Sequence, residues 1–136
     1  MSKQIEIDKK LTKYLQEKAY RSDKIIDELV AETLALGNVA RMQIAPEQGQ
    51  FLEIIVKISQ AKNCLEIGRF TGLSSLCIAK GLPENGKLVA IDNSDEFLLM
   101  AKKYWKMAEV DSKIESIIAD GVEAVSYTHL TLPTKA

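Results

Sequence analysis

The stretch LEIGRFTGLSSL, from Leu65 to Leu76, combines the end of a strand, a turn with two glycines and the start of a helix. The short apolar run from Cys64 to Ile67 predicts a buried strand that ends at Gly68. Gly72 then opens a helix. Glycines at these places let a ligand approach the backbone closely, and the amide groups at a helix N-terminus favour a carboxylate or a phosphate. The stretch therefore predicts a ligand-binding turn.

Two further runs with strand character follow this turn. Lys87 to Ile91 (KLVAI) is closed by Asp92, and Ile114 to Ala119 (IESIIA) forms the third predicted strand. Between them we expect a helix that is capped by Ser94. Strands that alternate with helices of this length indicate a parallel sheet with right-handed crossovers. The predicted fold class is α/β, with N-terminal helices followed by three parallel strands and intervening helices.

The first third of the chain is predicted to be helical. Ser22 or Asp23 could cap the second helix, Gly37 could terminate it, and Pro46 suits the first turn of a third helix. The apolar residues that recur at helical spacing are Leu11, Tyr14, Leu15, Ala19, Ile25, Ile26, Leu29, Val30, Leu34, Phe51, Leu52, Ile55, Val56 and Ile58.

Composition excludes several classes of protein. The 136 residues carry a net charge of −1, so no electrostatic argument favours a nucleic acid or an anionic membrane. Cys64 and Cys77 are too few for a zinc site or a disulfide framework. The apolar runs are too short to cross a membrane, and the N-terminus lacks the apolar core of a secretory signal. We expect one cytoplasmic domain without membrane contact.

The C-terminal residues differ in character from the rest. Val125 to Thr134 (VSYTHLTLPT) is what one reading frame of a transposase adapter from sequencing-library preparation encodes. The alternative is a native β-strand followed by a loop with Pro133. We expect residues 1–124 to be the N-terminal part of a cofactor-binding domain and residues 125–136 to be a non-native tail. His129, the only histidine, is therefore not assigned as a catalytic base.

The turn and the acid after the second strand together indicate a cofactor that carries a ribose. Asp92 lies 24 residues after Gly68, at the carboxyl end of the next strand, where an acid can accept hydrogen bonds from both ribose hydroxyls. A dinucleotide site requires a second glycine where this chain has Phe70, which argues against NAD. Glu66 adds an acid that could face an ammonium group. S-adenosylmethionine has both an amino acid end and a ribose. The alternative is that Glu66 pairs with a lysine and Gly72 is a packing glycine.

Three segments resemble the cation-dependent O-methyltransferases, the family that includes the caffeoyl-CoA and catechol O-methyltransferases. They are MQIAPEQGQFL (Met42 to Leu52), CLEIGRFTGLSS (Cys64 to Ser75) and VAIDNSDE (Val89 to Glu96). The resemblance covers roughly Ile5 to Ala124. It implies a partial Rossmann-like class I methyltransferase fold that binds S-adenosylmethionine, with the C-terminal part missing.

The resemblance also implies roles for individual residues, which we state by position. Met42 and Ile44 match a loop over the methionine part of the cofactor. Glu66, Gly68 and the backbone of Arg69 match its amino acid end, and Ser74 matches a hydroxyl that holds the methionine carboxylate. Asp92 matches the ribose acid, and Asp120 with Gly121 match a segment beside the adenine.

The chain departs from the family at one position and lacks a further set of residues. Arg69 stands where the family usually has a small or uncharged residue; it could pair with the cofactor carboxylate or point to solvent, and we expect solvent. The family's metal ligands would lie beyond Ala124, so no metal ligand or catalytic residue is assigned in this chain. A divalent, Mg²⁺-like cation is therefore expected only for the intact parent protein.

The implied activity is methyl transfer to a phenolic, catechol-like hydroxyl or to a hydroxylated RNA base, and the resemblance suggests a homodimer. Two alternatives stay open. One is a non-catalytic cofactor-binding fragment. Its first strand would normally pair with a fourth strand that this chain lacks, and the free edge would favour self-association. The other is an NAD-binding Rossmann protein, which titration with NADH would reveal.

Overall fold

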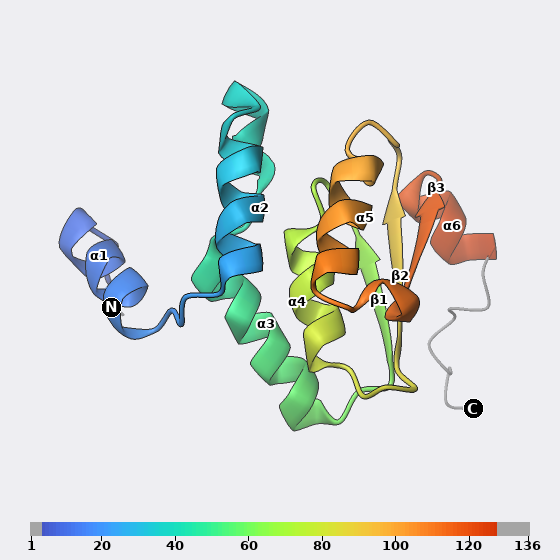
Figure 1. Cartoon of the computed structure of the whole chain (residues 1–136), viewed down its shortest axis with the longest axis horizontal. Coiled ribbons are helices and arrows are strands. Elements are labelled where there is room, and N and C mark those ends of the chain that lie inside the picture. Colours follow the sequence, from blue (N-terminus) through green and yellow to red (C-terminus); the bar gives the residue numbers. More distant parts are fainter. Residues whose placement is uncertain (1–3, 128–136) are drawn as a thin grey trace.

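The computed structural model describes residues 4–127, and Figure 1 shows their arrangement. The described part of the chain has six α-helices and three strands. From α3 onward, helices and strands alternate along the chain, as the sequence predicts. Helix α1 has no buried residue. The elements are α1 (Lys9–Lys18), α2 (Lys24–Leu34), a 3-10 helix (Gly37–Met42), α3 (Pro46–Ser59), β1 (Asn63–Ile67), α4 (Leu73–Gly81), β2 (Lys87–Asp92), α5 (Leu98–Met107), a 3-10 turn (Asp111–Lys113), β3 (Ile114–Ile118) and α6 (Gly121–Tyr127).

The three strands form one parallel sheet in the order β1-β2-β3, which confirms the predicted fold class. Ala90 in the central strand is in register with Glu66 of β1 and with Ser116 of β3. Because the strands are parallel, their carboxyl ends meet at one edge of the sheet. Gly68, which follows β1, and Asp92, which ends β2, therefore come close together. Within the described residues, β1 has a neighbour on one side only.

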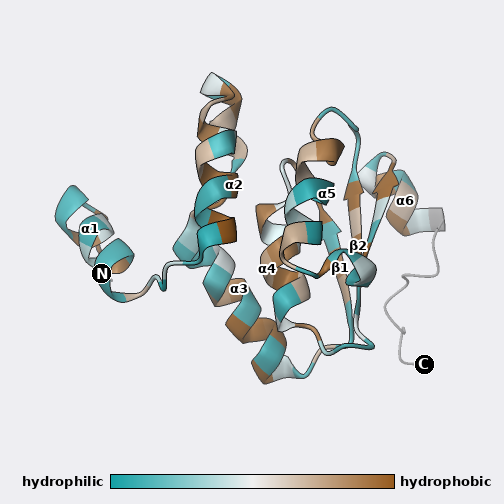
Figure 2. Ribbon diagram, in the orientation of Figure 1, coloured by the Kyte–Doolittle hydropathy of each residue, from teal (hydrophilic) through white to brown (hydrophobic). Residues whose placement is uncertain are grey.

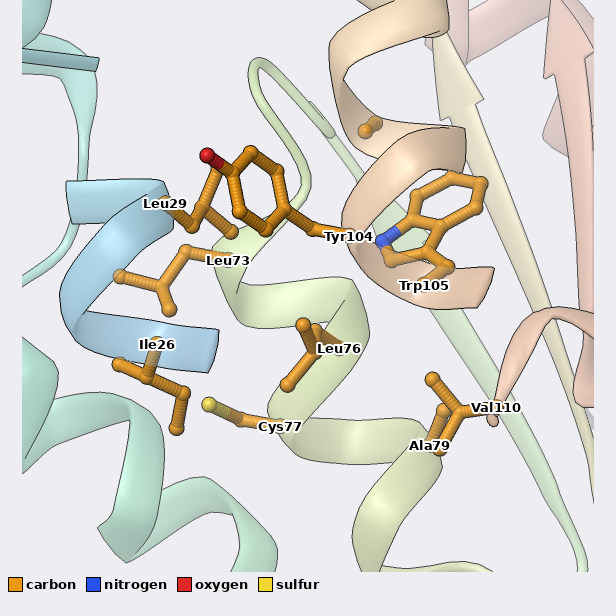
Figure 3. Packing of buried hydrophobic residues seen from close by; sticks show 10 residues of the cluster. Ile26, Leu29, Leu73, Leu76, Cys77, Ala79, Tyr104, Trp105 and Val110 are labelled. Atoms are coloured by element: carbon orange, nitrogen blue, oxygen red, sulfur yellow. The ribbon is translucent and has the colours of Figure 1, made fainter. Parts of the chain in front are cut away.

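The main core lies between α4 and the helices around it, as Figure 3 shows. Leu76 and Cys77 of α4 are fully buried against Ile26 and Leu29 of α2. Trp105 of α5 is 2% exposed. Its indole Nε1 donates a hydrogen bond to the carbonyl oxygen of Gly72 at 3.0 Å. A buried indole N–H normally needs such an acceptor, so this bond couples the core to the glycine turn.

A smaller cluster joins α3 to the sheet. Val56 of α3 packs with Leu82, Leu88 and Ala90, all of them buried. Gly81 ends α4 where a side chain would lie 2.7 Å from the carbonyl oxygen of Glu53, so α3 and α4 approach closely. In the hydropathy colouring of Figure 2, α3 and α4 both carry hydrophobic segments.

The predicted helix boundaries were partly right. Asp23 caps α2, because its Oδ1 accepts hydrogen bonds from the N–H groups of Ile25 and Ile26 at 3.0 and 3.2 Å. Pro46 begins α3 as predicted. Gly37 does not terminate α2, which ends at Leu34; it opens the following 3-10 helix instead, with φ +79°.

The predicted Ser94 cap of α5 was wrong. The helix begins at Leu98, and its preceding residue makes no side-chain cap. The hydroxyl of Ser94 accepts a hydrogen bond from the N–H of Glu96 at 3.1 Å, which forms a local turn in the loop after β2. Ser and Asp side chains form such turns as readily as they cap helices.

The segment predicted to be a non-native tail is described only at its start. Helix α6 includes Val125 and extends to Tyr127, and residues 128–136 lie outside the described part of the chain. His129 is among the latter. The adapter origin of residues 125–136 stays a prediction.

Candidate functional site

The turn between β1 and α4 has an unusual backbone. Gly68, Phe70 and Gly72 have φ values of +88°, +49° and +91°. A positive φ costs a residue with a side chain about 1–2 kcal/mol, so Phe70 needs compensating interactions. An added Cβ at Gly68 would meet no atom within 4 Å, whereas one at Gly72 would lie 2.7 Å from Ala101 Cβ and from Trp105 Nε1. Gly72 therefore serves packing, and Gly68 leaves space open above the turn.

Asp92 at the end of β2 supplies those interactions. Its Oδ2 accepts hydrogen bonds from the backbone N–H groups of Arg69 (2.9 Å) and Phe70 (3.0 Å). Its Oδ1 accepts one from the N–H of Ser94 at 3.1 Å. Burial alone would raise the pKa of Asp92, but the three backbone donors and the charge of Arg69 hold it below its ordinary value. The carboxylate is thus ionised at neutral pH and fixes the turn.

A cavity of about 360 Å³ opens beside this turn. That volume falls within the range usual for small-molecule sites. Two of its lining residues, Phe70 and Phe97, are in contact, with ring centroids 5.0 Å apart in an edge-to-face arrangement. The lining residues are Met42, Gly68, Phe70, Asp92, Asn93, Ser94, Glu96 and Phe97.

A second, smaller cavity of about 60 Å³ shares part of this lining and reaches the start of α4. It brings in Ile44, Arg69 and Ser74, together with Met42 and Gly68. Six of the nine predicted cofactor-binding residues, Met42, Ile44, Gly68, Arg69, Ser74 and Asp92, therefore line one or both of two adjoining cavities. Larger cavities of about 400 and 520 Å³ lie along β3 and the loops below it, and none of the nine lines them.

Glu66 lies on the same face of the sheet as Asp92, two register positions before it. Both of its carboxylate oxygens accept hydrogen bonds, one from the hydroxyl of Ser74 and one from that of Ser75. Burial raises the pKa of Glu66, with a smaller contribution from Asp92, whereas the two serines and Arg69 lower it. The net direction is upward, so the negative charge of Glu66 is unfavourable in the free protein and would gain from a cationic ligand. It pairs with no lysine among the described residues.

The expected solvent exposure of Arg69 was wrong. The residue is 2% exposed. Its Nη2 donates to the carbonyl oxygen of Ser94 at 2.8 Å, and its Nη1 to that of Phe70 at 3.3 Å. The physical reason is that two backbone carbonyls accept its N–H groups inside the protein. Burial lowers the pKa of Arg69, and the charges of Asp92, Glu66 and Asp95 offset part of this effect.

Asp120 and Gly121 are not brought to either cavity. Asp120 Oδ1 accepts hydrogen bonds from the N–H groups of Val122 (2.9 Å) and Glu123 (3.1 Å), so it caps α6. A Cβ at Gly121 would lie 2.7 Å from Ile67 Cγ2, which shows that α6 begins against β1. Their predicted place beside an adenine stays a prediction.

Sequence reasoning missed the cavity residues that follow Asp92. Asn93, Ser94, Glu96 and Phe97 all line it. Their position directly after a strand end, in a loop, was the available signal, since ligand-contacting residues concentrate there. Phe70, which the sequence indicates only as an obstacle to a dinucleotide, also lines this cavity.

The part of the chain that the structure describes contains no group of three His, Cys, Asp or Glu residues that could hold a metal ion. The described residues alone therefore assemble no site for a divalent cation, whose ligands are expected beyond Ala124. Among residues 4–127, no helix has both the length and the apolar character needed to span a membrane.

Comparisons with known proteins agree with this geometry. Residues 16–130 match the O-methyltransferase family. The chain is 37% identical over 118 residues to tapetum-specific methyltransferase 1 of Arabidopsis thaliana, a match that covers 85% of this chain and 51% of that protein. It is 33% identical over 91 residues to catechol O-methyltransferase of Niastella koreensis, with 65% and 41% covered. The structure of the O-methyltransferase from Bacillus cereus in complex with SAH superposes with a TM-score of 0.75 at 25% identity, covering 84% of this chain and 51% of that one.

The parallel sheet, the glycine turn and the acid after the second strand define the fold of a class I methyltransferase. The chain belongs to the O-methyltransferase family. It spans about half the length of the curated relatives that it matches along most of its own length.

Proposed function

We propose that this chain is the cofactor-binding part of an O-methyltransferase that uses S-adenosylmethionine. The observation that carries the proposal is the single site formed by the turn from Gly68 to Gly72 and by Asp92, beside cavities of about 360 and 60 Å³. Two of its features suit this cofactor: space above Gly68, and a half-buried acid, Glu66, for an ammonium group.

The residues of this chain bind and orient the cofactor. Asp92 Oδ2 already accepts two backbone hydrogen bonds, whereas Oδ1 accepts one. We therefore assign one ribose hydroxyl to Asp92 Oδ1 rather than both hydroxyls to the carboxylate as a whole. Phe70 and Phe97 would exclude water from the nucleoside, and Ser74 with Glu66 would hold the amino acid end. When bound, the cofactor supplies a methyl group on a sulfonium, and the protein supplies its placement.

The acceptor is proposed from relatives. One is named a catechol O-methyltransferase and another, from Medicago sativa and 40% identical over 74 residues, a caffeoyl-CoA O-methyltransferase. A phenolic or catechol-like hydroxyl is therefore our first candidate and a hydroxylated RNA base the second. A homodimer and a cytoplasmic location remain predictions of the same kind.

We further propose that the chain by itself binds the cofactor without turnover. The described residues contain no group of three His, Cys, Asp or Glu side chains that could hold a metal ion. We accordingly derive no step through a cation. Methyl transfer by this chain to a catechol would contradict this part of the proposal.

Isothermal titration of the chain with S-adenosylhomocysteine tests the binding. We expect saturable binding at one site, abolished in Asp92→Ala, and no heat from NADH. Saturable binding of NADH with none of S-adenosylhomocysteine would instead support the dinucleotide alternative. Absence of binding by a folded chain, checked by its thermal melt, would overturn the proposal.

A further inference from the structure

Arg69 joins the two loops that form the cavity walls, through both its main chain and its side chain. Its backbone N–H donates to Asp92 at the end of β2. Its guanidinium donates to the carbonyl oxygen of Ser94, 25 residues further along the chain and in the loop after β2. The third contact, with the carbonyl of Phe70, lies within the glycine turn itself. One residue therefore links both loops on the side of the 360 Å³ cavity.

The guanidinium also lies among acids. Asp92, Glu66 and Asp95 all act on its charge, and burial opposes them. An arginine keeps its charge in proteins, so a fixed cation lies near enough to these carboxylates to affect their ionisation. The charge of Asp92 raises the pKa of Glu66 whereas that of Arg69 lowers it, so without Arg69 this offset to the repulsion of Asp92 would be lost.

Two other roles for this side chain fit the structure less well. An arginine that points to solvent would be exposed, and this one is 2% exposed. An arginine that binds the cofactor carboxylate would offer it two parallel N–H groups along one edge of the guanidinium. Here Nη1 and Nη2 are engaged with carbonyl oxygens, and only Nε is without a hydrogen-bond partner among the described residues.

We propose that Arg69 is a positioning residue that fixes the β1–α4 turn against the loop after β2, so that the cofactor cavity is already formed in the free protein. The inference rests on the proposed function for the identity of the ligand but not for the link between the loops. It assigns to the Arg69 side chain a role that a small or uncharged residue could not fill.

The test compares Arg69→Gln and Arg69→Lys with Arg21→Gln, an exposed arginine outside the site. In the free chain, hydrogen exchange of the Phe70 and Ser94 amides should become at least about tenfold faster in Arg69→Gln, because loss of one charge-assisted hydrogen bond shifts an opening equilibrium by that order. Arg69→Lys can reach one carbonyl but not both, so it should give an intermediate rate. Arg21→Gln should exchange as the wild type does.

Calorimetry adds the functional readout. The affinity for S-adenosylhomocysteine should fall about tenfold or more in Arg69→Gln and be partly restored in Arg69→Lys. As the pH is lowered, the affinity should begin to fall at a higher pH in Arg69→Gln than in the wild type. The reason is that Glu66 and Asp92 lose the cation that favours their ionised forms. A change of packing alone would not shift the pH at which the affinity falls.

The two proposals fail in different ways. If the wild type does not bind S-adenosylhomocysteine, the proposed function is overturned while the exchange rates still decide the role of Arg69. Unchanged amide exchange in both Arg69 variants would overturn the positioning role, as would equal rates in Arg69→Gln and Arg21→Gln. If Arg69→Gln does not fold, Arg69→Lys provides the same comparison.

Discussion

The carboxylate of Asp92 accepts a hydrogen bond from the backbone N–H of Phe70 at 3.0 Å, and Phe70 holds a left-handed backbone conformation with φ +49°. The two observations explain each other. A non-glycine residue is strained in that region, and an ionised acceptor offsets the strain by fixing the amide. An acid that the sequence indicates as a ligand for ribose is therefore also a structural part of the turn.

Asp92→Ala should for that reason damage both stability and binding. It leaves the amides of Arg69, Phe70 and Ser94 without their acceptor, at an expected loss of about 2–4 kcal/mol in the free energy of unfolding. Urea denaturation measures this loss. Asp92→Asn, which keeps one oxygen acceptor, should lose less. Equal stability of Asp92→Ala and wild type would show that the turn does not depend on this carboxylate.

The same carboxylate predicts a dependence on pH. The pKa of Asp92 is lower in the folded protein than its ordinary value, so the folded state favours the ionised form. Its contribution to stability is complete above the ordinary pKa of about 3.9 and is lost as the pH falls through the lower, folded value. Acid titration followed by circular dichroism should show a steeper loss of stability below pH 4 in the wild type than in Asp92→Asn. Parallel curves would contradict the assignment.

Much of the turn could be predicted from the sequence, because glycine requirements and strand ends are local properties. Gly72 precedes α4 and Asp92 ends the next strand, as expected, and the structure adds that Gly68 and Gly72 have positive φ. The direction of the Arg69 side chain could not be predicted in this way, since its partner is a backbone carbonyl 25 residues away. Periodicity gives no direction to a side chain in an irregular turn. Ser94 failed as a cap for a related reason, because a local turn competed for its hydroxyl.

Two glycines of the turn should respond differently to the same substitution. Gly72→Ala places a methyl group 2.7 Å from Ala101 Cβ and Trp105 Nε1 at φ +91°, so we expect a loss of about 3 kcal/mol or more in stability. Gly68→Ala meets no atom within 4 Å, so it should cost only the backbone strain, about 1–2 kcal/mol.

The comparison separates packing from ligand contact. Gly68→Ala should fold and yet lose most of its affinity for S-adenosylhomocysteine, because the added methyl group enters the space above the turn. Thermal melts monitored by Trp105, the only tryptophan, report on the turn directly through its bond to Gly72. Normal binding by Gly68→Ala would place the cofactor elsewhere.

Glu66→Gln should stabilise the free protein while it weakens binding. The pKa of Glu66 is raised in the folded state, chiefly by burial, so its protonated form is favoured there. Its contribution to stability is present below its ordinary pKa and is lost as the pH rises through the folded value. The glutamine, which keeps the shape and can still bond to Ser74 and Ser75, should therefore raise the melting temperature at pH 7, and the difference should vanish in acid.

Binding should change in the opposite direction. Loss of a half-buried negative charge opposite an ammonium group should reduce the affinity for S-adenosylhomocysteine by roughly 10–100-fold. Glu115→Gln, on an exposed part of β3, is the matched control and should leave the affinity unchanged. If Glu66→Gln binds S-adenosylhomocysteine as well as the wild type does, the amino acid end of the cofactor does not lie at this acid.

A stripe of exposed apolar residues on α3 should drive self-association of the chain. Phe51, Ile54, Ile55 and Ile58 are 59%, 51%, 45% and 74% exposed. Their spacing places them on one face of the helix. In β1, Ile67 is 59% exposed, and the strand has no neighbour on its outer side within the described residues. Exposed apolar surface and an open strand edge each favour association of copies.

Substitution on that stripe tests its part in the association. The double variant Phe51→Lys with Ile58→Lys should lower the weight-average mass measured by sedimentation, because it places two charges in the stripe without touching the buried Val56 of the same helix. Leu99→Lys is the matched control, since Leu99 is 83% exposed on α5. A similar fall in mass with Leu99→Lys would mean that added charge alone prevents association. A wild-type chain that sediments as a monomer at every concentration would show that the stripe does not drive association.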